Sequence, residues 1–316
     1  MTNVTVDHFG EYGIHDLDGL AQAKLAIAHL IGAEGLVILN ADDPLLRAKG
    51  AALAVTPPRK PIGWFALELN RARTAGGVAA SGVRKGQLVL EWRGVEHLLG
   101  AIESFPLTLG GSAVYNIANL AAAAVVAAAV GVAPVNIAAA FSRFGERAAD
   151  NPGRLQRYVL GGITLLLDYA HNADGLAGLL HVAETLRGHG FVRGRLLLLL
   201  GHAGNRQLSD FDALAAVAAA AHPDLIVLKE IEGFERGRQR GEIPLLLQAA
   251  LVRHGMSRSA LTVEAGELDA VRCALARAHT GDVLVMPVHA LRARAATLAL
   301  IETLLARGWR AGQPLP

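Results

Sequence analysis

Cysteine is nearly absent from this chain, which has one, Cys273, among 316 residues. A single cysteine excludes an internal disulfide framework and fits a protein of a reducing compartment. The amino-terminal residues contain no basic segment followed by an apolar one, so no signal peptide is predicted. We therefore expect a cytoplasmic protein.

Long apolar runs and basic runs are also scarce, although the mean hydropathy is +0.35. The most apolar stretch, residues 117–133, is mostly alanine and only just reaches the length of a membrane span. A buried helix is expected there, and no membrane partner. The net charge is +2, and the arginines are scattered without interleaved aromatic residues, which argues against nucleic acid as a partner.

Two glycine-rich signatures are missing as well. The chain has no Gly-x-x-x-x-Gly-Lys-Ser/Thr segment, the phosphate loop whose backbone N–H groups cradle phosphates. It also has no Gly-x-Gly-x-x-Gly after a predicted strand, which disfavours a dinucleotide-dependent oxidoreductase. A nucleotide site in this chain would have to rest on other motifs.

Predicted strands and helices alternate, which favours α/β architecture with parallel sheets. The first half reads as the end of a strand at 2–7, a helix at 17–30, strands at 35–39, 62–66 and about 77–102, and helices at 113–130 and 135–144. The second half is more regular, with strands at 155–160, 163–168, 195–200, 224–229, 260–264 and 283–287, and helices at about 174–188, 208–221, 243–254, 267–279 and 291–306. We predict a partial domain over residues 1–148 and a complete, mostly parallel Rossmann-like domain over residues 149–316.

The most informative feature is a pair of motifs, Asn-Pro-Gly-Arg at 151–154 and Asp-Tyr-Ala-His-Asn at 168–172. The first places Arg154 in a turn, and the second places Asp168 and His171 at the carboxyl end of a predicted strand. Ligands of open α/β sheets bind at that end of the strands. An aspartate can accept ribose hydroxyls, and an arginine can contact phosphate. Singly, Asp168 reads as a helix cap and His171 as a surface residue, but together the motifs predict a nucleotide pocket.

These motifs resemble the opening of the carboxyl-terminal domain of the Mur ligase superfamily. Further matches follow in the order that the family has: residues 2–8 with His8, then Lys24, Asn-Ala-Asp-Asp-Pro at 40–44, Tyr-Asn-Ile-Ala-Asn at 115–119 and Gly-His-Ala-Gly-Asn-Arg at 201–206. Lys229-Glu230 and the segment from Arg236 to Glu242 look most like cyanophycin synthetase. The resemblance implies that residues 1–148 are part of the central ATPase domain of the family and residues 149–316 its carboxyl-terminal domain.

The resemblance also implies a reaction and roles for single residues. A carboxylate would attack the γ-phosphate of ATP, and an amine would displace phosphate from the acyl phosphate, with catalysis by positioning and charge neutralisation. ATP and Mg²⁺ are the implied cofactors, and an amino acid and an acidic peptide or polymer are the implied substrates. The implied catalytic residues are His8 as a magnesium ligand, Lys24, if carbamoylated, as the holder of a second metal, and Arg154. The implied ATP-binding residues are Asn116, Asn119, Arg154, Asp168 and His171, and the implied substrate-binding residues are Asn205, Arg206, Arg236 and Arg238.

Several departures leave alternatives open. Besides the missing phosphate loop, Tyr115 stands for a family histidine, Ala173 for a proline and Asn205 for an aspartate. Opening on the end of a strand, the chain is expected to be a fragment or to work with a partner or upstream segment that brings the phosphate loop. A degenerate, non-catalytic scaffold that binds a nucleotide or a peptide is the alternative. Lys24 and the arginine cluster that includes Arg236 could also be solvated surface residues.

Overall fold

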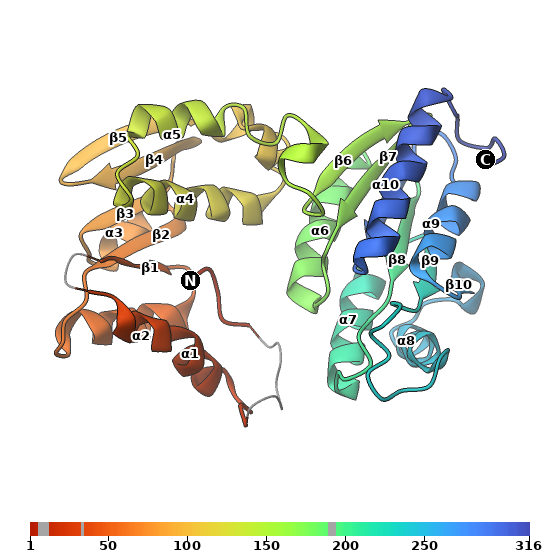
Figure 1. Ribbon diagram of the computed structural model, residues 1–316, viewed down its shortest axis with the longest axis horizontal. Coiled ribbons are helices and arrows are strands. Elements are labelled where there is room, and N and C mark those ends of the chain that lie inside the picture. The colour runs from red at the N-terminus through yellow and green to blue at the C-terminus, as the bar shows by residue number, and fades with distance from the viewer. Residues whose placement is uncertain (6–12, 33–34, 189–193) are drawn as a thin grey trace. The chain divides into compact units, whose positions relative to one another are not determined.

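The computed structural model describes residues 1–5, 13–32, 35–188 and 194–316. The chain divides into two compact units, Met1–Arg147 and Ala148–Pro316 (Figure 1). Each unit has its own sheet and its own apolar core. The α/β fold predicted from the sequence is confirmed.

The sheet of the amino-terminal unit mixes parallel and antiparallel strands in the order β1-β2-β3-β4-β5. These are β1 (Val37–Asn40), β2 (Ile62–Glu68), β3 (Ala79–Arg84), β4 (Gln87–Trp92) and β5 (Val95–Ala101). The first three are parallel, and the last three form antiparallel hairpins. Lys85-Gly86 and Arg93-Gly94 make the two turns, all with positive φ, which matches the twist of tight hairpins.

Helices cover both faces of this sheet because neighbouring strand residues point to opposite sides. Trp64 is buried in one core cluster with α1 and α2, and Phe65 in the other with α4. The helices of the unit are α1 (Leu17–Leu25), α2 (Pro44–Val55), α3 (Leu69–Thr74), α4 (Val114–Ala129) and α5 (Pro134–Phe141), with short 3₁₀ turns at Ala26–Leu30, Ile102–Ser104 and Pro106–Thr108. The alanine-rich stretch is α4, whose small side chains allow close packing on the sheet. No helix within the described ranges is both long and apolar enough to cross a membrane.

The beginning of the chain differs from the prediction. Residues 2–5 form no strand, and residues 6–7 lie outside the described residues. The Met1 ammonium group donates to the Ile38 carbonyl at 2.5 Å, and the Asn40 amide donates to the Thr2 carbonyl at 2.8 Å. An end group and a side chain therefore hold this segment beside β1. The predicted helix at 17–30 is also split, since α1 ends at Leu25 and a 3₁₀ turn follows.

The carboxyl-terminal unit has a six-stranded sheet in the order β10-β9-β8-β11-β7-β6. Its strands are β6 (Gln156–Leu160), β7 (Ile163–Asp168), β8 (Leu196–Leu200), β9 (Leu225–Lys229), β10 (Leu261–Glu264) and β11 (Val283–Pro287). All pairs are parallel except the hairpin of β6 and β7, which turns at Gly161-Gly162 as predicted.

Among the described residues, the helices that pack on this sheet are α6 (Ala173–Leu186), α7 (Leu208–Ala220), α8 (Glu242–Arg253), α9 (Glu267–Ala276) and α10 (Leu291–Ala306) (Figure 1). The central strands are continuous apolar runs, and all five residues of β8 are buried leucines. Such runs are typical of parallel strands covered on both faces. Because β7, β8, β9 and β11 are parallel, their carboxyl ends lie at one edge of the sheet.

Candidate functional site at the carboxyl edge of the second sheet

Asp168 ends β7 and anchors the turn that carries Arg154. Its side chain is 8% exposed and accepts the Leu155 N–H at 2.6 Å. Burial raises the pKa of Asp168, whereas N–H groups, first that of Leu155, and the charge of Arg154 oppose the rise. Asp168 is not a helix cap, because Asn172 caps α6 by accepting the Gly175 N–H. The motifs at 151–154 and 168–172 are therefore joined in space.

The aromatic ring of Tyr169 contacts the side chains of two arginines and two histidines. The guanidinium carbon of Arg154 lies 4.8 Å from its ring centroid, and that of Arg294 lies 5.1 Å away. The rings of His171 and His289 lie 5.5 and 5.2 Å from it. Both Arg–Tyr distances are those of cation–π contacts. The edge of the sheet thus presents two guanidinium groups on one aromatic ring.

Arg294 was not predicted from the sequence. Its Nε and Nη2 donate to the Val288 carbonyl at 3.3 and 3.1 Å, and Nη2 also donates to the His289 carbonyl at 3.2 Å. A Cβ added to Gly153 would lie 2.7 Å from Nη1 of Arg294. Glycine at 153 therefore lets the turn and Arg294 approach closely. The only sequence signal was an arginine in the first turns of the last helix.

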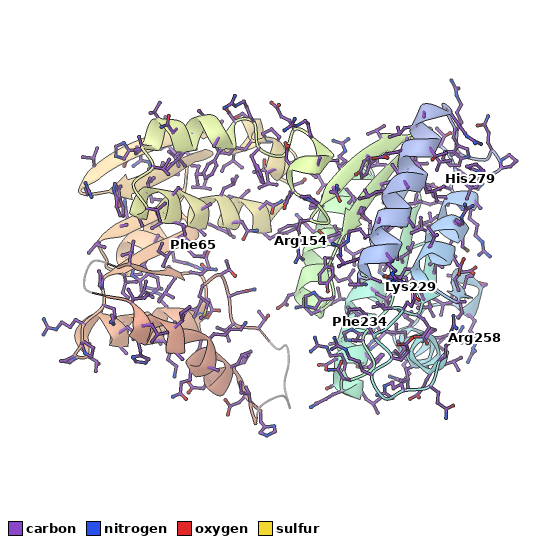
Figure 2. The ribbon with its side chains drawn as sticks, in the orientation of Figure 1. Phe65, Arg154, Lys229, Phe234, Arg258 and His279 are labelled. Atoms are coloured by element: carbon purple, nitrogen blue, oxygen red, sulfur yellow. The ribbon has the colours of Figure 1, made fainter. Side chains whose placement is uncertain are left out.

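A buried charged cluster, formed by Lys229, Glu267 and His289, lies at the same edge. Figure 2 shows Lys229 inside the carboxyl-terminal unit, where its side chain is fully buried. Its Nζ donates to Oε1 of Glu267 and lies 3.3 Å from Nδ1 of His289. Glu267 also accepts the backbone N–H groups of His289 at 2.9 Å and Ala290 at 2.7 Å. The cluster joins the ends of β9 and β11 to the start of α9.

The charges of this cluster follow from its contacts. Burial alone would raise the pKa of Glu267, but hydrogen bonds from His289 and the charge of Lys229 lower it to about 2. Burial lowers the pKa of Lys229, against the pull of Glu267. Burial and the charge of Lys229 lower the pKa of His289. Nε2–H of His289 donates to the Ala170 carbonyl at 3.0 Å, because a carbonyl oxygen can only accept, and Nδ1 faces both Lys229 and Glu267. The cluster therefore holds the loop that carries Tyr169 and His171.

The four predicted substrate-binding residues lie together on two loops of this unit. Arg236 donates to the side chain of Asn205 at 3.2 Å and stacks on Phe234, which Figure 2 labels. Arg238 donates to the Gly204 carbonyl at 2.9 Å, to Glu242 at 2.6 Å, and at 3.5 Å to the Arg206 carbonyl.

Gly204 is required where these two loops meet. An added Cβ there would lie 1.8 Å from the Glu235 carbonyl oxygen. The loop at 231–241 is thus ordered by hydrogen bonds and close backbone packing, and its arginines Arg236 and Arg238 are not independent solvated side chains.

In the amino-terminal unit, Asn116 holds backbone instead of facing open space. It is 4% exposed, and its amide donates to the Leu107 carbonyl at 2.9 Å. Asn119 is exposed and donates to Oδ1 of Asn116 at 3.3 Å. A pocket of about 440 Å³ lies beside the start of α4. Its lining residues are Leu67, Glu68, Leu69, Asn70, Val83, Arg84, Lys85, Val114 and Ile117.

The aspartates of the Asn-Ala-Asp-Asp-Pro motif at 40–44 are structural. Asp42 accepts the Leu67 N–H at 2.6 Å, and Asp43 caps α2 by accepting the Leu45 and Leu46 N–H groups. Asp43 also accepts the Val4 N–H at 2.7 Å. The motif therefore ties β1 to β2, to α2 and to the first residues of the chain.

The two predicted metal-binding residues are not brought together by any described contact. Lys24 lies in the last turn of α1 with its side chain exposed, and His8 lies outside the described residues. Within the described ranges, no three His, Cys, Asp or Glu side chains gather in a way that could hold a metal ion. The described residues therefore define no magnesium site.

The geometry of the second unit agrees with its family. Residues 153–287 match the family model of the Mur ligase glutamate ligase domain. The chain belongs to the Mur ligase superfamily, as its motifs indicated. It is 31% identical to a cyanophycin synthetase of Trichormus variabilis over 257 residues, which are 80% of this chain and 27% of that protein. It is 28% identical over 294 residues to the UDP-N-acetylmuramoyl-L-alanyl-D-glutamate–2,6-diaminopimelate ligase of Thermosynechococcus vestitus, covering 90% of this chain and 52% of that ligase.

A solved structure shows the same fold. The folylpolyglutamate synthase/dihydrofolate synthase of Yersinia pestis, complexed with AMPPNP and a Mn ion, aligns with 95% of this chain and 60% of its own, with a TM-score of 0.62 and 16% identity. This chain spans about a quarter of the length of the cyanophycin synthetases that it matches.

Proposed function

We propose that this chain carries the nucleotide- and amino-acid-binding parts of an ATP-dependent amide ligase. The observation that supports this most is the meeting of Arg154, Asp168 and Tyr169 at the carboxyl edge of β7, inside a domain of the Mur ligase family. One relative is named as a ligase of UDP-N-acetylmuramoyl-L-alanyl-D-glutamate and 2,6-diaminopimelate, which supports a ligase reaction for this chain. The arrangement of basic groups beside an anchored aspartate suits a nucleoside phosphate.

The proposed reaction has two steps. A carboxylate oxygen of the acceptor attacks the γ-phosphorus of ATP, the bond to the bridging oxygen breaks, and ADP leaves. The amine nitrogen then attacks the acyl carbon, phosphate leaves with the electron pair of the broken C–O bond, and the nitrogen loses its proton. Arg154 would contact the phosphates and His171 would lie close to them, while Asp168 would hold the turn of Arg154 and face the ribose. These are assignments to this chain's own residues and rest on the contacts described above.

The adenine base is assigned to the pocket beside α4, and the metal to the segments that contain His8 and Lys24. The pocket beside α4 is large enough for a purine ring. Asn119 is exposed on α4. Asn116 would act by holding α4 in place through its bond to the Leu107 carbonyl. The assignment of Mg²⁺ rests on the resemblance of the segments with His8 and Lys24. The described side chains form no site for it.

The loop at residues 231–241, which carries Arg236 and Arg238 and is called the basic loop, supports an amino acid and an acidic peptide or polymer as substrates. Arg236, with Asn205 beside it, could take a carboxylate, because guanidinium groups bind carboxylates with two fixed donors. The resemblance to cyanophycin synthetases makes a polymer of amino acids the first acceptor to test. The phosphate loop that the family uses would come from a partner or an upstream segment.

Release of inorganic phosphate tests this proposal. The chain is mixed with ATP, Mg²⁺, acidic peptides and single amino acids, alone and joined to the coding region upstream of it. Phosphate release that needs both the peptide and the amino acid supports ligase activity, and a dependence on Mg²⁺ would support the metal. If both proteins stay silent with every pair of substrates, the ligase proposal is wrong.

The second candidate is a non-catalytic scaffold that keeps a nucleotide or peptide site. The missing phosphate loop and Asn205 favour it. Calorimetry together with the phosphate-release assay separates the two candidates. A scaffold binds an ATP analogue or an acidic peptide without turnover, whereas a ligase binds both and releases phosphate.

A further inference from the structure

Arg294 shares the ring of Tyr169 with Arg154, and we propose that both guanidinium groups hold the phosphates of the bound nucleotide. This inference rests on the proposed nucleotide site and adds a residue to it. Arg294 is the fourth residue of α10, and it lies far in the sequence from the turn that carries Arg154. The two guanidinium carbons nevertheless lie 4.8 and 5.1 Å from the ring centroid of the same Tyr169.

Neither guanidinium group forms an ion pair with a carboxylate within the described part of the chain. The charge of Arg154 acts on Asp168, but the hydrogen bond described for Asp168 comes from the Leu155 N–H and not from the guanidinium group. Glu267 is engaged by Lys229 inside the unit. Arg294 donates only to the neutral carbonyls of Val288 and His289. Two guanidinium groups around one aromatic ring, neither of them in an ion pair, favour an anion with more than one negative charge.

The close approach at Gly153 supports a shared site. Nη1 of Arg294 makes no hydrogen bond with the described residues and lies next to Gly153, the residue before Arg154. An oxygen bound by Arg154 at this turn would come within reach of that group. Arginine presents its donors in a rigid fork, and stacking on Tyr169 fixes the plane of each fork. A purely structural role for Arg294 would need the bonds to Val288 and His289 but not the stacking beside Arg154.

Calorimetry with the whole chain tests the inference, using ATP, adenosine and inorganic pyrophosphate as probes. The variants are R294M, R294K and R154M, and the control is R292M, which removes an exposed arginine two residues from Arg294 on the same helix. We expect R294M and R154M each to weaken pyrophosphate and ATP binding about tenfold or more, because a lost charge-assisted hydrogen bond has that effect. R294K should lie between R294M and the wild type, since lysine keeps the charge and loses the fork. Adenosine binding and the R292M control should be unchanged.

The outcomes separate this inference from the proposed function. If R154M loses pyrophosphate binding and R294M and R294K do not, Arg294 is structural and the inference is wrong, while the nucleotide site stands. If pyrophosphate binding depends on both arginines but phosphate release is never seen, the inference holds and the ligase proposal fails. If the wild-type chain binds neither pyrophosphate nor ATP, the inference is wrong. If R294M does not fold, R294K gives the same decision.

Discussion

The ammonium group of Lys229 lies 3.3 Å from Nδ1 of His289, although 60 residues separate them in the chain. Parallel packing of β9, β8, β11 and β7 brings them to one edge, where Glu267 forms an ion pair with Lys229 and its Oε1 lies 3.2 Å from Nδ1 of His289. His289 then donates to the Ala170 carbonyl beside Tyr169. The buried charged cluster thus holds the loop of Tyr169 and His171, which belongs to the proposed nucleotide site, through the bond of His289 to Ala170.

Replacing Lys229 by methionine is expected to destabilise the second unit by about 3–5 kcal/mol. The change leaves Glu267 as a buried carboxylate without its ion-pair partner, and a buried, uncompensated charge destabilises the folded state. Amide hydrogen exchange of β11 measures the effect within this unit. The double variant K229M/E267Q should lose less than the two single variants together, because it removes both charges. Purely additive losses would contradict coupling within the cluster.

Acid should weaken the second unit through the same cluster. The folded pKa of Glu267, about 2, is below its ordinary 4.5, so the unfolded chain takes up the proton first as the pH falls. The stability that Glu267 contributes is present above pH 4.5 and is lost as the pH falls from 4.5 towards 2. A shift of this size corresponds to about 3 kcal/mol. The lowered pKa of His289 acts in the same direction and begins below its ordinary value of 6.5.

Hydrogen exchange of β11 between pH 7 and about pH 2 measures this loss, because the window set by Glu267 lies between its ordinary pKa of 4.5 and its folded pKa of about 2. The E267Q variant should show a lower opening free energy at pH 7 and a weaker dependence on pH below 4.5. An equally steep acid dependence in E267Q would assign the loss to other carboxylates.

Much of this fold could be predicted from the sequence, because its signals are local. The apolar runs of β7, β8, β9 and β11 and the turn at Gly161-Gly162 mark the second sheet, and the structure confirms them. The pairing of the motifs at 151–154 and 168–172 was also accessible, since both flank one hairpin. The end of strand predicted at 2–7 was wrong for residues 2–5, because the contacts to Ile38 and Asn40 are long-range.

The rest of the site depends on distant contacts. Lys229, Glu267 and His289 come from three separate elements, and each alone reads as an ordinary polar residue after a strand or at a helix start. Only the strand order places them together. Arg294 was missed for the same reason, because its partner Tyr169 lies 125 residues before it. The assignments of His8 and Lys24 remain predictions, to be tested by the metal dependence of the reaction.

Gly153→Ala should impair both the stability and the anion site of the second unit. Gly153 has a φ of +72°, and its new Cβ would meet Arg294 at 2.7 Å. Strain at positive φ costs about 1 kcal/mol, and the displaced Arg294 adds to the effect. We expect a drop of about 1–3 kcal/mol in the opening free energy of β6 and β7, with weaker pyrophosphate binding.

Gly255→Ala is the matched control, since Gly255 has a φ of +89° in the same unit and nothing within 4 Å of an added Cβ. It should show the backbone strain alone and leave pyrophosphate binding unchanged. Equal effects of the two substitutions on binding would mean that the approach of Arg294 to the turn is unimportant.

Loss of the Arg238 side chain should disorder the basic loop, whereas loss of Arg236 should change only binding. Arg238 donates to Glu242 and to the carbonyl of Gly204, and its guanidinium carbon lies 5.4 Å from the ring centroid of Phe211. Arg236 has the single side-chain bond to Asn205 and stacks on Phe234. In R238M, amide exchange across residues 231–241 should quicken about tenfold or more, because several charge-assisted bonds are lost.

In R236M, exchange in this loop should stay within about twofold of the wild type, since surface contacts contribute little to stability. If Arg236 takes the carboxylate of a substrate, R236M should raise the KM for the amino acid or the peptide in the phosphate-release assay while kcat changes less. The same KM in R236M and the wild type, for every substrate that supports release, would return Arg236 to the role of a solvated surface residue.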